Sequence, residues 1–286
     1  MANYRILFNP KANGGKGKEE AEKLSSILTG DSLSFEDITA ITSWSDFFAS
    51  LGEGELPVLT GGDGTLNRFV NDTDGVDYPC DILYYPTGTG NDFAADVGIR
   101  SGEAPKVITD YLKDLPVVRV NGMTRRFLNG IGYGIDGYCC EVGDDLHAAG
   151  KTDVNYAGIA IKGLLFHFKP RNAKITIDGV TEEVKKVWLA PAMNGRMYGG
   201  GMIPTPDQKR LAPKEEKQLS VLVWHGSGKI STLAVFPSIF KGEHLGHPKM
   251  CNVKTGRKVR VEFDAPTALQ IDGETVRNVM SYEAEI

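Results

Sequence analysis

The 286-residue sequence has few cysteines, no long apolar run and no excess of basic residues, and each of these shortages excludes a class of protein. Its four cysteines are few and scattered, which excludes a disulfide-stapled scaffold. No apolar run is long enough to cross a bilayer, and the first one meets Asn9-Pro10 too early for a secretory signal. Basic residues number 32 against 37 acidic ones, so the chain lacks the positive excess of a nucleic-acid-coating protein. We expect a cytoplasmic protein with no transmembrane segment and no nucleic-acid partner.

The first part of the chain alternates short apolar runs with helical patterns. Hydrophobic residues make up 41% and charged residues 24%, which is typical of a globular protein, and the length allows two compact units. Expected strands cover 4–8, 56–59 and 81–85, and expected helices cover 19–28, 66–70, 92–97 and 107–112. Strands that alternate with helices indicate a doubly wound parallel sheet with helices on both faces. We expect this α/β domain to span residues 1–124.

From residue 125 the pattern becomes β-rich. Expected strands cover 174–178, 183–189, 219–224, 259–264 and 268–271. Asp178-Gly179 and Asp272-Gly273 are typical hairpin turns. We therefore expect residues 125–286 to form a mainly antiparallel β-sandwich with few helices, and the polar segment 207–218 to be a surface loop.

Glycine-rich loops follow the expected strands of the first domain. Gly61-Gly62-Asp63-Gly64-Thr65 comes after one strand and before a helix, and the loop at 86–93 repeats this arrangement with Thr89, Asn91 and Asp92. Such loops can turn main-chain N–H groups toward a phosphate at a helix N-terminus. The alternative for each is a capped turn without a ligand, with Asp63 as an N-cap. The loop at 9–18 is a third, with lysines that could neutralise phosphate or be solvated.

These loops together resemble the catalytic domain of diacylglycerol and sphingoid-base kinases, in the superfamily that includes NAD kinase and phosphofructokinase. The specific motifs are Gly-Gly-Asp-Gly-Thr-x-Asn at 61–67 and Gly-Thr-x-Asn-Asp-Phe-Ala at 88–94. Weaker matches continue at 127–132, 199–202 and 270–274. The resemblance implies a doubly wound N-terminal domain related to NAD kinase, a β-sandwich C-terminal domain, and the use of ATP and Mg²⁺.

The resemblance also implies roles for individual residues. Residues expected to border the nucleotide are Asn9, Pro10, Lys11, Ala12, Asn13, Thr39, Gly61, Gly62, Asp63, Gly64, Thr65, Leu66, Asn67, Arg68, Thr89, Asn91 and Asp92. Thr42 is an alternative to Thr39. Glu274 matches the general base, since a carboxylate can take the proton of an attacking alcohol. Asp63 and Asp272 are the other expected catalytic carboxylates, and which of Asp63, Asp92 and Asp272 would hold the nucleotide's magnesium stays open.

One segment departs from the family pattern. Relatives have Asp-Gly after the Gly-Gly-Gly motif, where the Asp holds a structural magnesium ion. Here the segment is Lys-Glu-Glu-Lys-Gln-Leu at 214–219. Glu216 is the candidate ligand, but Lys217 places a cation beside it.

Other patterns have less specific interpretations. The G-x-G-x-x-G match at 132–137 lacks a clear helix after it, so we expect a flexible turn. His244, His247 and Cys251 are half of a metal site at most, and we expect solvent-facing side chains there. The apolar segments 159–168 and 233–240, with lysines around them, indicate core or interdomain helices, an acyl-chain pocket, or an amphipathic face on anionic lipid.

We expect a lipid kinase that acts on a substrate at a membrane surface, with peripheral membrane contact. Diacylglycerol is the leading acceptor, giving phosphatidate. The alternatives are a sphingoid base or another long-chain alcohol, NAD, and a nucleotide-binding module without activity. A homodimer is one open assembly state.

Overall fold

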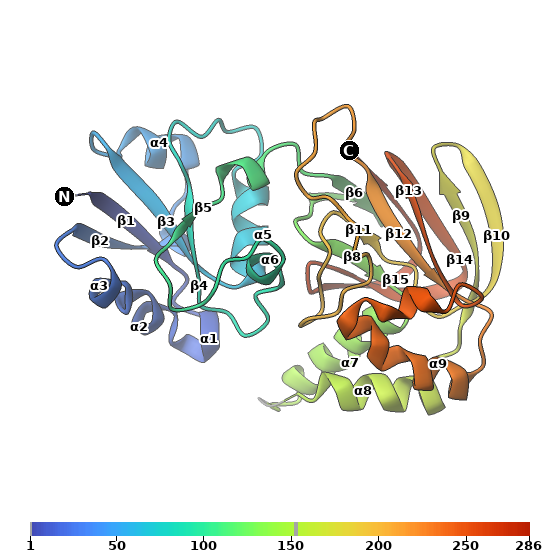
Figure 1. Ribbon diagram of the computed structural model, residues 1–286. Coiled ribbons are helices and arrows are strands. Elements are labelled where there is room, and N and C mark those ends of the chain that lie inside the picture. Colours follow the sequence, from blue (N-terminus) through green and yellow to red (C-terminus); the bar gives the residue numbers. More distant parts are fainter. Residues whose placement is uncertain (1, 152–153) are drawn as a thin grey trace. The chain divides into compact units, whose positions relative to one another are not determined.

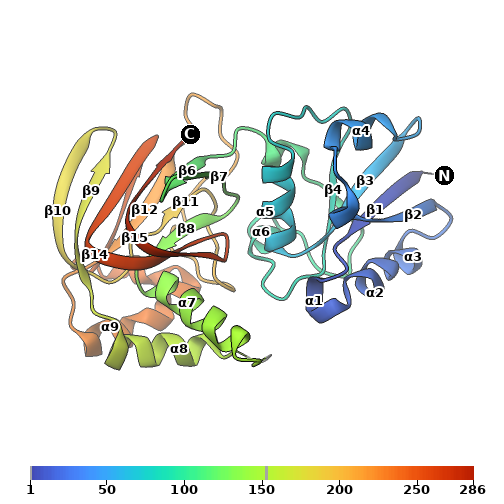
Figure 2. The ribbon, with the colours of Figure 1, turned by 180° about the vertical axis from the view of Figure 1, so that it is seen from behind.

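The computed structural model describes residues 2–151 and 154–286, and the chain divides into two compact units, Met1–Lys113 and Asp114–Ile286. Figures 1 and 2 show them from opposite sides. Each unit has a sheet of its own. The predicted fold class, an α/β unit followed by a mainly antiparallel β unit, is confirmed.

The first unit contains a sheet with the strand order β2-β1-β3-β4-β5. Its strands are β1 (Asn3–Phe8), β2 (Ser32–Asp37), β3 (Glu55–Gly61), β4 (Leu83–Pro86) and β5 (Lys106–Val107). Strands β1 to β4 are parallel, and β5 is antiparallel to β4. The helices are α1 (Ala12–Gly15), α2 (Gly17–Glu22), α3 (Leu24–Ile27), α4 (Trp44–Ala49), α5 (Asp63–Asp72) and α6 (Asp92–Asp96), with 3₁₀ turns η1 (Ile38–Ala40) and η2 (Thr109–Leu112). The expected helix over 107–112 is replaced by the end of β5 and the turn η2.

The two faces of this sheet are covered by different helices. Successive residues of a strand point to opposite faces, and on one face Ile6 and Val58 pack with Ala21 and Leu24 of α2 and α3. On the other face the ring of Tyr84 lies edge-on to Phe93 of α6, with 5.9 Å between ring centroids. Figure 1 shows α2 and α3 on one side of the sheet and α4 on the other.

The parallel register brings four strand ends to one edge. Phe8 pairs with Asp37 on one side and with Thr60 on the other, and Gly61 pairs with Pro86. The loops that follow β1, β2, β3 and β4 therefore start at the same edge of the sheet, where open α/β sheets bind ligands.

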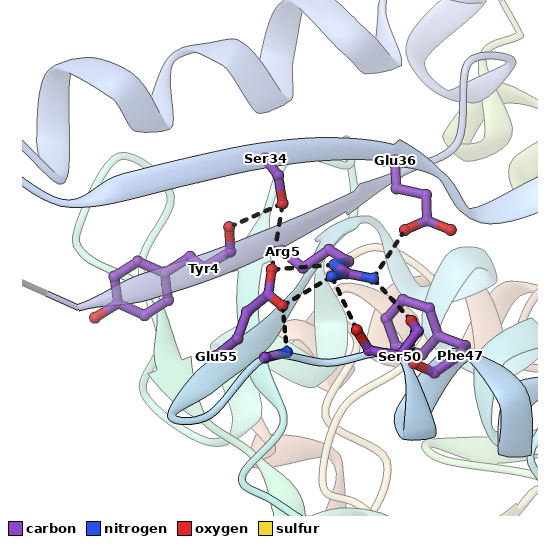
Figure 3. Close-up of polar contacts among 8 residues, drawn as sticks. Tyr4, Arg5, Ser34, Glu36, Phe47, Ser50 and Glu55 are labelled. Atoms are coloured by element: carbon purple, nitrogen blue, oxygen red, sulfur yellow. Dashed lines mark hydrogen bonds and ion pairs between the residues drawn. The ribbon is translucent and has the colours of Figure 1, made fainter.

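An arginine ties β1 to its neighbours away from that edge. The guanidinium of Arg5 donates to Glu55 through Nε and Nη2, at 3.1 and 2.8 Å, and through Nη1 to Ser50 Oγ at 2.9 Å (Figure 3). It also lies over the ring of Phe47, 5.8 Å from the centroid. Partial burial opposes ionisation of Glu55, but the Gly52 N–H and Arg5 outweigh it and lower the pKa of this carboxyl. The contacts join β1, β3 and α4.

The second unit is built around an antiparallel sheet with the order β13-β12-β11-β8-β14-β15-β6-β7, and β9 joins β14 to β10. Its strands are β6 (Val117–Val120), β7 (Met123–Arg126), β8 (Gly130–Tyr133), β9 (Arg171–Ile177), β10 (Val180–Val187), β11 (Ala192–Met193), β12 (Leu219–Trp224), β13 (Cys251–Gly256), β14 (Lys258–Ile271) and β15 (Glu274–Glu285). Strand β14 pairs with β9 through its first half and with β8 through its second half. The rings of Tyr133 and Phe263 stack inside this curved sheet, 4.0 Å apart.

Helical segments gather at one end of the second unit, as both views show. They are α7 (Ile135–Ala148), α8 (Tyr156–Lys162), the π-helix η3 (Gly163–His167), α9 (Lys229–Val235), and the 3₁₀ helices η4 (Phe236–Lys241) and η5 (Glu243–Gly246). The expected flexible turn at 132–137 is wrong, because α7 begins at Ile135. Its glycines permit close packing: a Cβ on Gly137 would lie 2.1 Å from Ala268 O, and one on Gly143 would lie 2.6 Å from the Tyr156 ring.

The second unit begins earlier than the expected domain boundary at residue 124. Strand β6 pairs with β15 from Val117 to Val120, and β7 pairs with β6. Both strands therefore belong to the second sheet. Across residues 2–151 and 154–286, no helix has the length and apolar character that a bilayer span requires.

Candidate functional site

One carboxylate joins two of the glycine-rich loops in the first unit. Asp63 opens α5, and its Oδ2 accepts the N–H of Asp92 while its Oδ1 accepts the N–H of Phe93, both at 2.9 Å. The alternative in which Asp63 caps its own helix does not describe these bonds, because its side chain binds the start of α6. The loops after β3 and β4 are held as one structure.

Glycine allows the same two loops to touch through their backbones. Thr87 N–H donates to Gly61 O at 2.9 Å. A Cβ on Gly88 would lie 2.5 Å from Gly62 Cα, closer than any real contact. Gly61 has a φ of 153° and a Cβ there would lie 2.4 Å from Thr65 Oγ1. Side chains at these positions would force the loops apart.

The N-terminal loop contacts the same place. Asn13, in the left-handed region with φ 52°, donates from its side-chain amide to Thr87 O. Gly17 is required behind it, because a Cβ would lie 1.9 Å from Asn9 O. The structure therefore brings together all three loops that the sequence singled out.

Two buried polar atoms at this junction lack a partner in the described part of the chain. They are Thr87 Oγ1 and Asn91 Oδ1. Asn91 itself has φ 51°, and its amide nitrogen donates to Gly88 O. A buried acceptor or hydroxyl without a partner is costly, so these atoms fit a site that a polar ligand completes.

The remaining predicted residues lie around this junction. Exposed are Lys11, Gly64, Arg68 and Thr89; partly buried are Asn9, Pro10, Ala12, Asn13, Gly62, Asp63 and Asn91; buried are Gly61, Thr65, Leu66, Asn67 and Asp92. Thr39 lies just after β2 at the same edge, where its N–H and hydroxyl donate to Asp37 Oδ1 at 2.8 and 2.7 Å. Its alternative, Thr42, is exposed beyond the turn η1.

The predicted carboxylates of the second unit have different surroundings. Asp272 is 8% exposed and accepts the backbone N–H groups of Leu128, Asn129 and Gly130 at 2.6, 2.8 and 3.0 Å. It therefore holds the segment that enters β8. Glu274 is half exposed and forms an ion pair with Arg125 of β7. The glycine-rich loops belong to the first unit, whereas Glu274 belongs to the second.

A polar network missed by the sequence analysis surrounds the segment held by Asp272. Arg210 donates to Leu128 O and to Asn129 Oδ1, the latter at 2.9 Å, and Asn194 Nδ2 donates to Leu128 O at 2.8 Å. The expected surface loop at 207–218 is therefore wrong in part, because Gln208, Arg210 and Lys217 are buried. They stand in a polar, charged segment, so the sequence carries no signal of their burial.

A buried carboxyl lies at the start of α7. Asp136 Oδ2 accepts the hydroxyl of Tyr198 at 2.9 Å, and Oδ1 has no partner among the described residues. Burial raises the pKa of Asp136 to about 6, although the Tyr198 hydroxyl opposes the shift. A Cβ on Gly132 would lie 1.7 Å from this carboxyl, which explains the glycine. The group can exchange a proton close to neutral pH.

The expectation that the weak metal candidates face the solvent is wrong for His244 and Cys251, which are both buried, whereas His247 is exposed. His244 is buried, its Nε2 lies 3.0 Å from Pro204 O, and its ring stacks on Trp224. Burial lowers the pKa of His244. Among residues 2–151 and 154–286, no cluster of three or more His, Cys, Asp and Glu side chains could hold a metal, and Glu216 is exposed.

Comparison with known proteins agrees with this geometry. The model of the diacylglycerol kinase catalytic domain matches residues 3–120, and that of the YegS C-terminal NAD kinase beta sandwich-like domain matches residues 129–283. The chain belongs to the diacylglycerol kinase catalytic-domain family. It is therefore a kinase of a lipid kinase family, as the resemblance predicted.

Individual relatives of this kinase cover most of its length. A diacylglycerol kinase of Mycobacterium tuberculosis is 28% identical over 227 residues, which are 76% of this chain and 70% of the relative. One of Bacillus subtilis is 25% identical over 291 residues, which are 96% and 90%. A solved structure of a diacylglycerol kinase from Bacillus anthracis has a TM-score of 0.61 at 20% identity and covers 99% of this chain and 93% of its own. That structure supports the fold.

The contact between the two loops predicts different effects for neighbouring glycines. Gly88→Ala should lower the free energy of unfolding by about 2 kcal/mol, because its Cβ meets the backbone of Gly62. Gly90→Ala is the matched control, since the nearest atoms to its Cβ are 3.8 and 3.9 Å away. Urea denaturation measures both. Equal losses in the two variants would contradict the packing described here.

The raised pKa of Asp136 predicts a pH-dependent stability. The folded state keeps a proton that the unfolded state releases, so this contribution is full below about pH 4 and is lost as the pH rises through about 6. Asp136→Asn cannot ionise. The free energy of unfolding of the variant minus that of the wild type should therefore rise by up to about 3 kcal/mol between about pH 4 and 7. Exposed Asp144→Asn on the same helix should show no such rise, and a pH-independent difference for Asp136→Asn would refute the shift.

Proposed function

We propose that this kinase transfers the γ-phosphoryl group of ATP to the hydroxyl of diacylglycerol, giving phosphatidate. The use of ATP is supported by one observation, the junction of three glycine-rich loops at one edge of the sheet. At this junction Asp63 accepts hydrogen bonds from the start of α6. The acceptor is supported by relatives named diacylglycerol kinase that align with up to 96% of the chain.

The glycine-rich junction suits a triphosphate. Gly64 and Thr89 are exposed there, and exposed Lys11 adds positive charge, whereas Arg68 is paired with Asp72 at 3.1 Å. The Thr87 hydroxyl and the Asn91 carbonyl oxygen, which have no partner among the described residues, are suitable for polar groups of the nucleotide. We assign the nucleotide's phosphates to this edge.

Two carboxylates of the junction fit a magnesium ion that arrives with the nucleotide. Asp63 Oδ2 and Asp92 Oδ2 lie 3.8 and 3.9 Å from the Cβ position of Gly90. Protein magnesium sites typically use one or two carboxylates together with substrate phosphates. The ion would neutralise charge on the phosphates, and Asp63 and Asp92 would hold it.

Glu274 is the proposed general base. As the hydroxyl oxygen of the lipid attacks the γ-phosphorus, Glu274 accepts its proton, and the bond to the β-phosphate oxygen breaks to release ADP. Arg125 fixes the orientation of this carboxylate through its ion pair. Asp272 would support the reaction by holding residues 128–130 beside the same hairpin turn.

The alternatives differ in acceptor. A sphingoid base or another long-chain alcohol would use the same base and the same phosphate site. NAD is less favoured because the order of the motifs along the whole chain fits lipid kinases better. We place the reaction in the cytoplasm at a membrane surface, where diacylglycerol resides.

Replacing the proposed base should stop turnover without affecting the nucleotide. Glu274→Gln should reduce transfer of label from γ-labelled ATP to diacylglycerol by about 10²- to 10⁴-fold. Its ATP affinity, measured by calorimetry, should equal that of the wild type, because the proposed role of this carboxylate is to accept a proton from the lipid hydroxyl and not to bind the nucleotide. Exposed Glu183→Gln in the same unit is the control. Undiminished turnover in Glu274→Gln would remove Glu274 as the base, and wild-type transfer to NAD or sphingosine but not diacylglycerol would overturn the acceptor.

A further inference from the structure

The helical end of the second unit exposes large apolar side chains. Exposed fractions are 46% for Tyr156, 47% for Ile161, 72% for Phe166, 81% for Ile230 and 46% for Phe240. They come from α8, η3, α9 and η4, and we call the surface of these four segments the α8–α9 face. Soluble proteins rarely gather such side chains in one exposed patch without a partner.

The segments of this face are fixed to one another and to the core. Lys229 Nζ of α9 donates to Leu165 O of η3 at 2.7 Å. Beneath them Leu164, Phe168 and Ile239 are buried in one apolar cluster with Trp188 and Trp224. The segments are thus anchored by their inner side chains. The exposed apolar side chains on the outside are therefore available to contact another surface.

The spacing on α9 directs apolar groups to one side. Ile230 and Ala234 are both exposed and stand four residues apart, which is the spacing of one face of an α-helix. An exposed apolar face of this kind buries itself in the boundary between lipid head groups and acyl chains.

The charge of the face selects the lipid. Lys162, Lys169, Lys229 and Lys241 are exposed on or beside it, and segments 154–177 and 217–242 contain no Asp or Glu in a chain of net charge −5. Within the described ranges 2–151 and 154–286, none of these four lysines forms an ion pair with a carboxylate. Anionic lipid attracts such lysines, each by about 1 kcal/mol.

A pocket lined in part by His167 and Lys169, which follow Phe166 in the sequence, adds a place for a head group. It has a volume of about 190 Å³. Its polar lining includes His167, Lys169, Arg171, Thr267, Asn278 and Glu141. The one carboxylate, Glu141, is paired with Arg277 at 3.6 Å. The remaining cationic groups suit a lipid phosphate.

We propose that the α8–α9 face docks on an anionic bilayer. The proposal rests on the lipid kinase function above, since it explains how the chain reaches an acceptor that stays in a membrane. Apolar side chains enter the interface, and the lysines contact the anionic head groups.

Vesicle sedimentation of the full chain tests the docking. Vesicles of phosphatidylcholine alone are compared with vesicles of equal parts phosphatidylcholine and phosphatidylglycerol, at low and high salt. Lys162→Gln with Lys241→Gln should weaken binding to the anionic vesicles by about fivefold per lysine. Phe166→Ser with Ile230→Ser should weaken it at both salt concentrations, because apolar insertion is not screened.

Matched variants elsewhere in the same unit are the controls. Val180 is 76% exposed at the tip of the β9–β10 hairpin, and Lys185 is exposed on β10. Val180→Ser and Lys185→Gln should bind as the wild type does. Absence of wild-type binding to anionic vesicles, or equal weakening by the control variants, would overturn the proposal.

A soluble acceptor separates this proposal from the kinase function. Short-chain diacylglycerol below its micelle concentration needs no membrane, so the variants of the α8–α9 face should phosphorylate it at the wild-type rate. Wild-type activity on this acceptor without vesicle binding would end the docking proposal alone. Vesicle binding without activity on any lipid would end the proposed function alone.

A second inference concerns the segment where relatives hold a structural magnesium ion. Arg257 Nη1 donates to Lys214 O at 2.6 Å, to Lys217 O at 3.2 Å and to Glu215 O at 3.4 Å. Carbonyl oxygens of this kind are ligands for hard cations. Here they converge on a guanidinium, so they do not fit a divalent ion.

Lys217 supplies another cation inside the same segment. Its side chain is 5% exposed, and Nζ donates to Asp114 O at 2.8 Å. Burial lowers the pKa of Lys217, and Asp114 partly opposes this shift. Glu216, the candidate ligand, is exposed in the turn directly before Lys217. We infer that Arg257 and Lys217 take the place of the structural metal.

Metal analysis of the nucleotide-free chain tests this inference. After gel filtration into metal-free buffer, the protein should contain no stoichiometric magnesium, and its Tm should be the same with a chelator as with added Mg²⁺. Arg257→Gln and Lys217→Gln should lower the Tm, whereas ion-paired surface Arg277→Gln should change it little. Bound magnesium, or a chelator-induced fall in the wild-type Tm, would overturn the inference even if the variants fail to fold.

Discussion

The glycine-rich edge depends on one carboxylate that serves two helices. Asp63 opens α5 yet binds the first N–H groups of α6, so the loops after β3 and β4 cannot move separately. The backbone contact between Gly62 and Gly88 leaves no space for side chains between them. Asn13 then adds the N-terminal loop by bonding Thr87 O. The proposed phosphate site would thus be formed before the ligand arrives, which reduces the ordering cost of binding.

Much of this edge could be predicted, because glycine pairs after buried strands have a local cause. The alternation of apolar runs and helical patterns likewise identified β1, β3 and β4. Strand β2 was not predicted because Ser32–Asp37 is an outermost strand of the sheet, and its alternating polar side chains resemble those of a loop. The bond from Asp63 to the N–H of Phe93 joins residues 30 positions apart, and no local pattern encodes it.

The second unit was harder to predict because tertiary packing overrides local preference there. Helix α7 contains glycines that weaken a helix, yet Gly137 and Gly143 let it approach β14 and Tyr156 closely. Arg210 and Lys217 look like surface residues in a charged segment. In the structure each donates a hydrogen bond to a backbone carbonyl group from a distant part of the chain. The resemblance located Glu274 and Asp272, whereas their partners Arg125 and residues 128–130 come only from the structure.

The long hairpin of β14 and β15 has a consequence for the order of folding. Its strands are adjacent in sequence, so they can pair with little loss of chain entropy. The bond between Asp272 and Leu128 spans 144 residues and forms only when the chain closes a large loop. The turn that contains Asp272 and Glu274 can therefore form before β8 pairs with β14. The hairpin can then act as the template on which β8 is aligned.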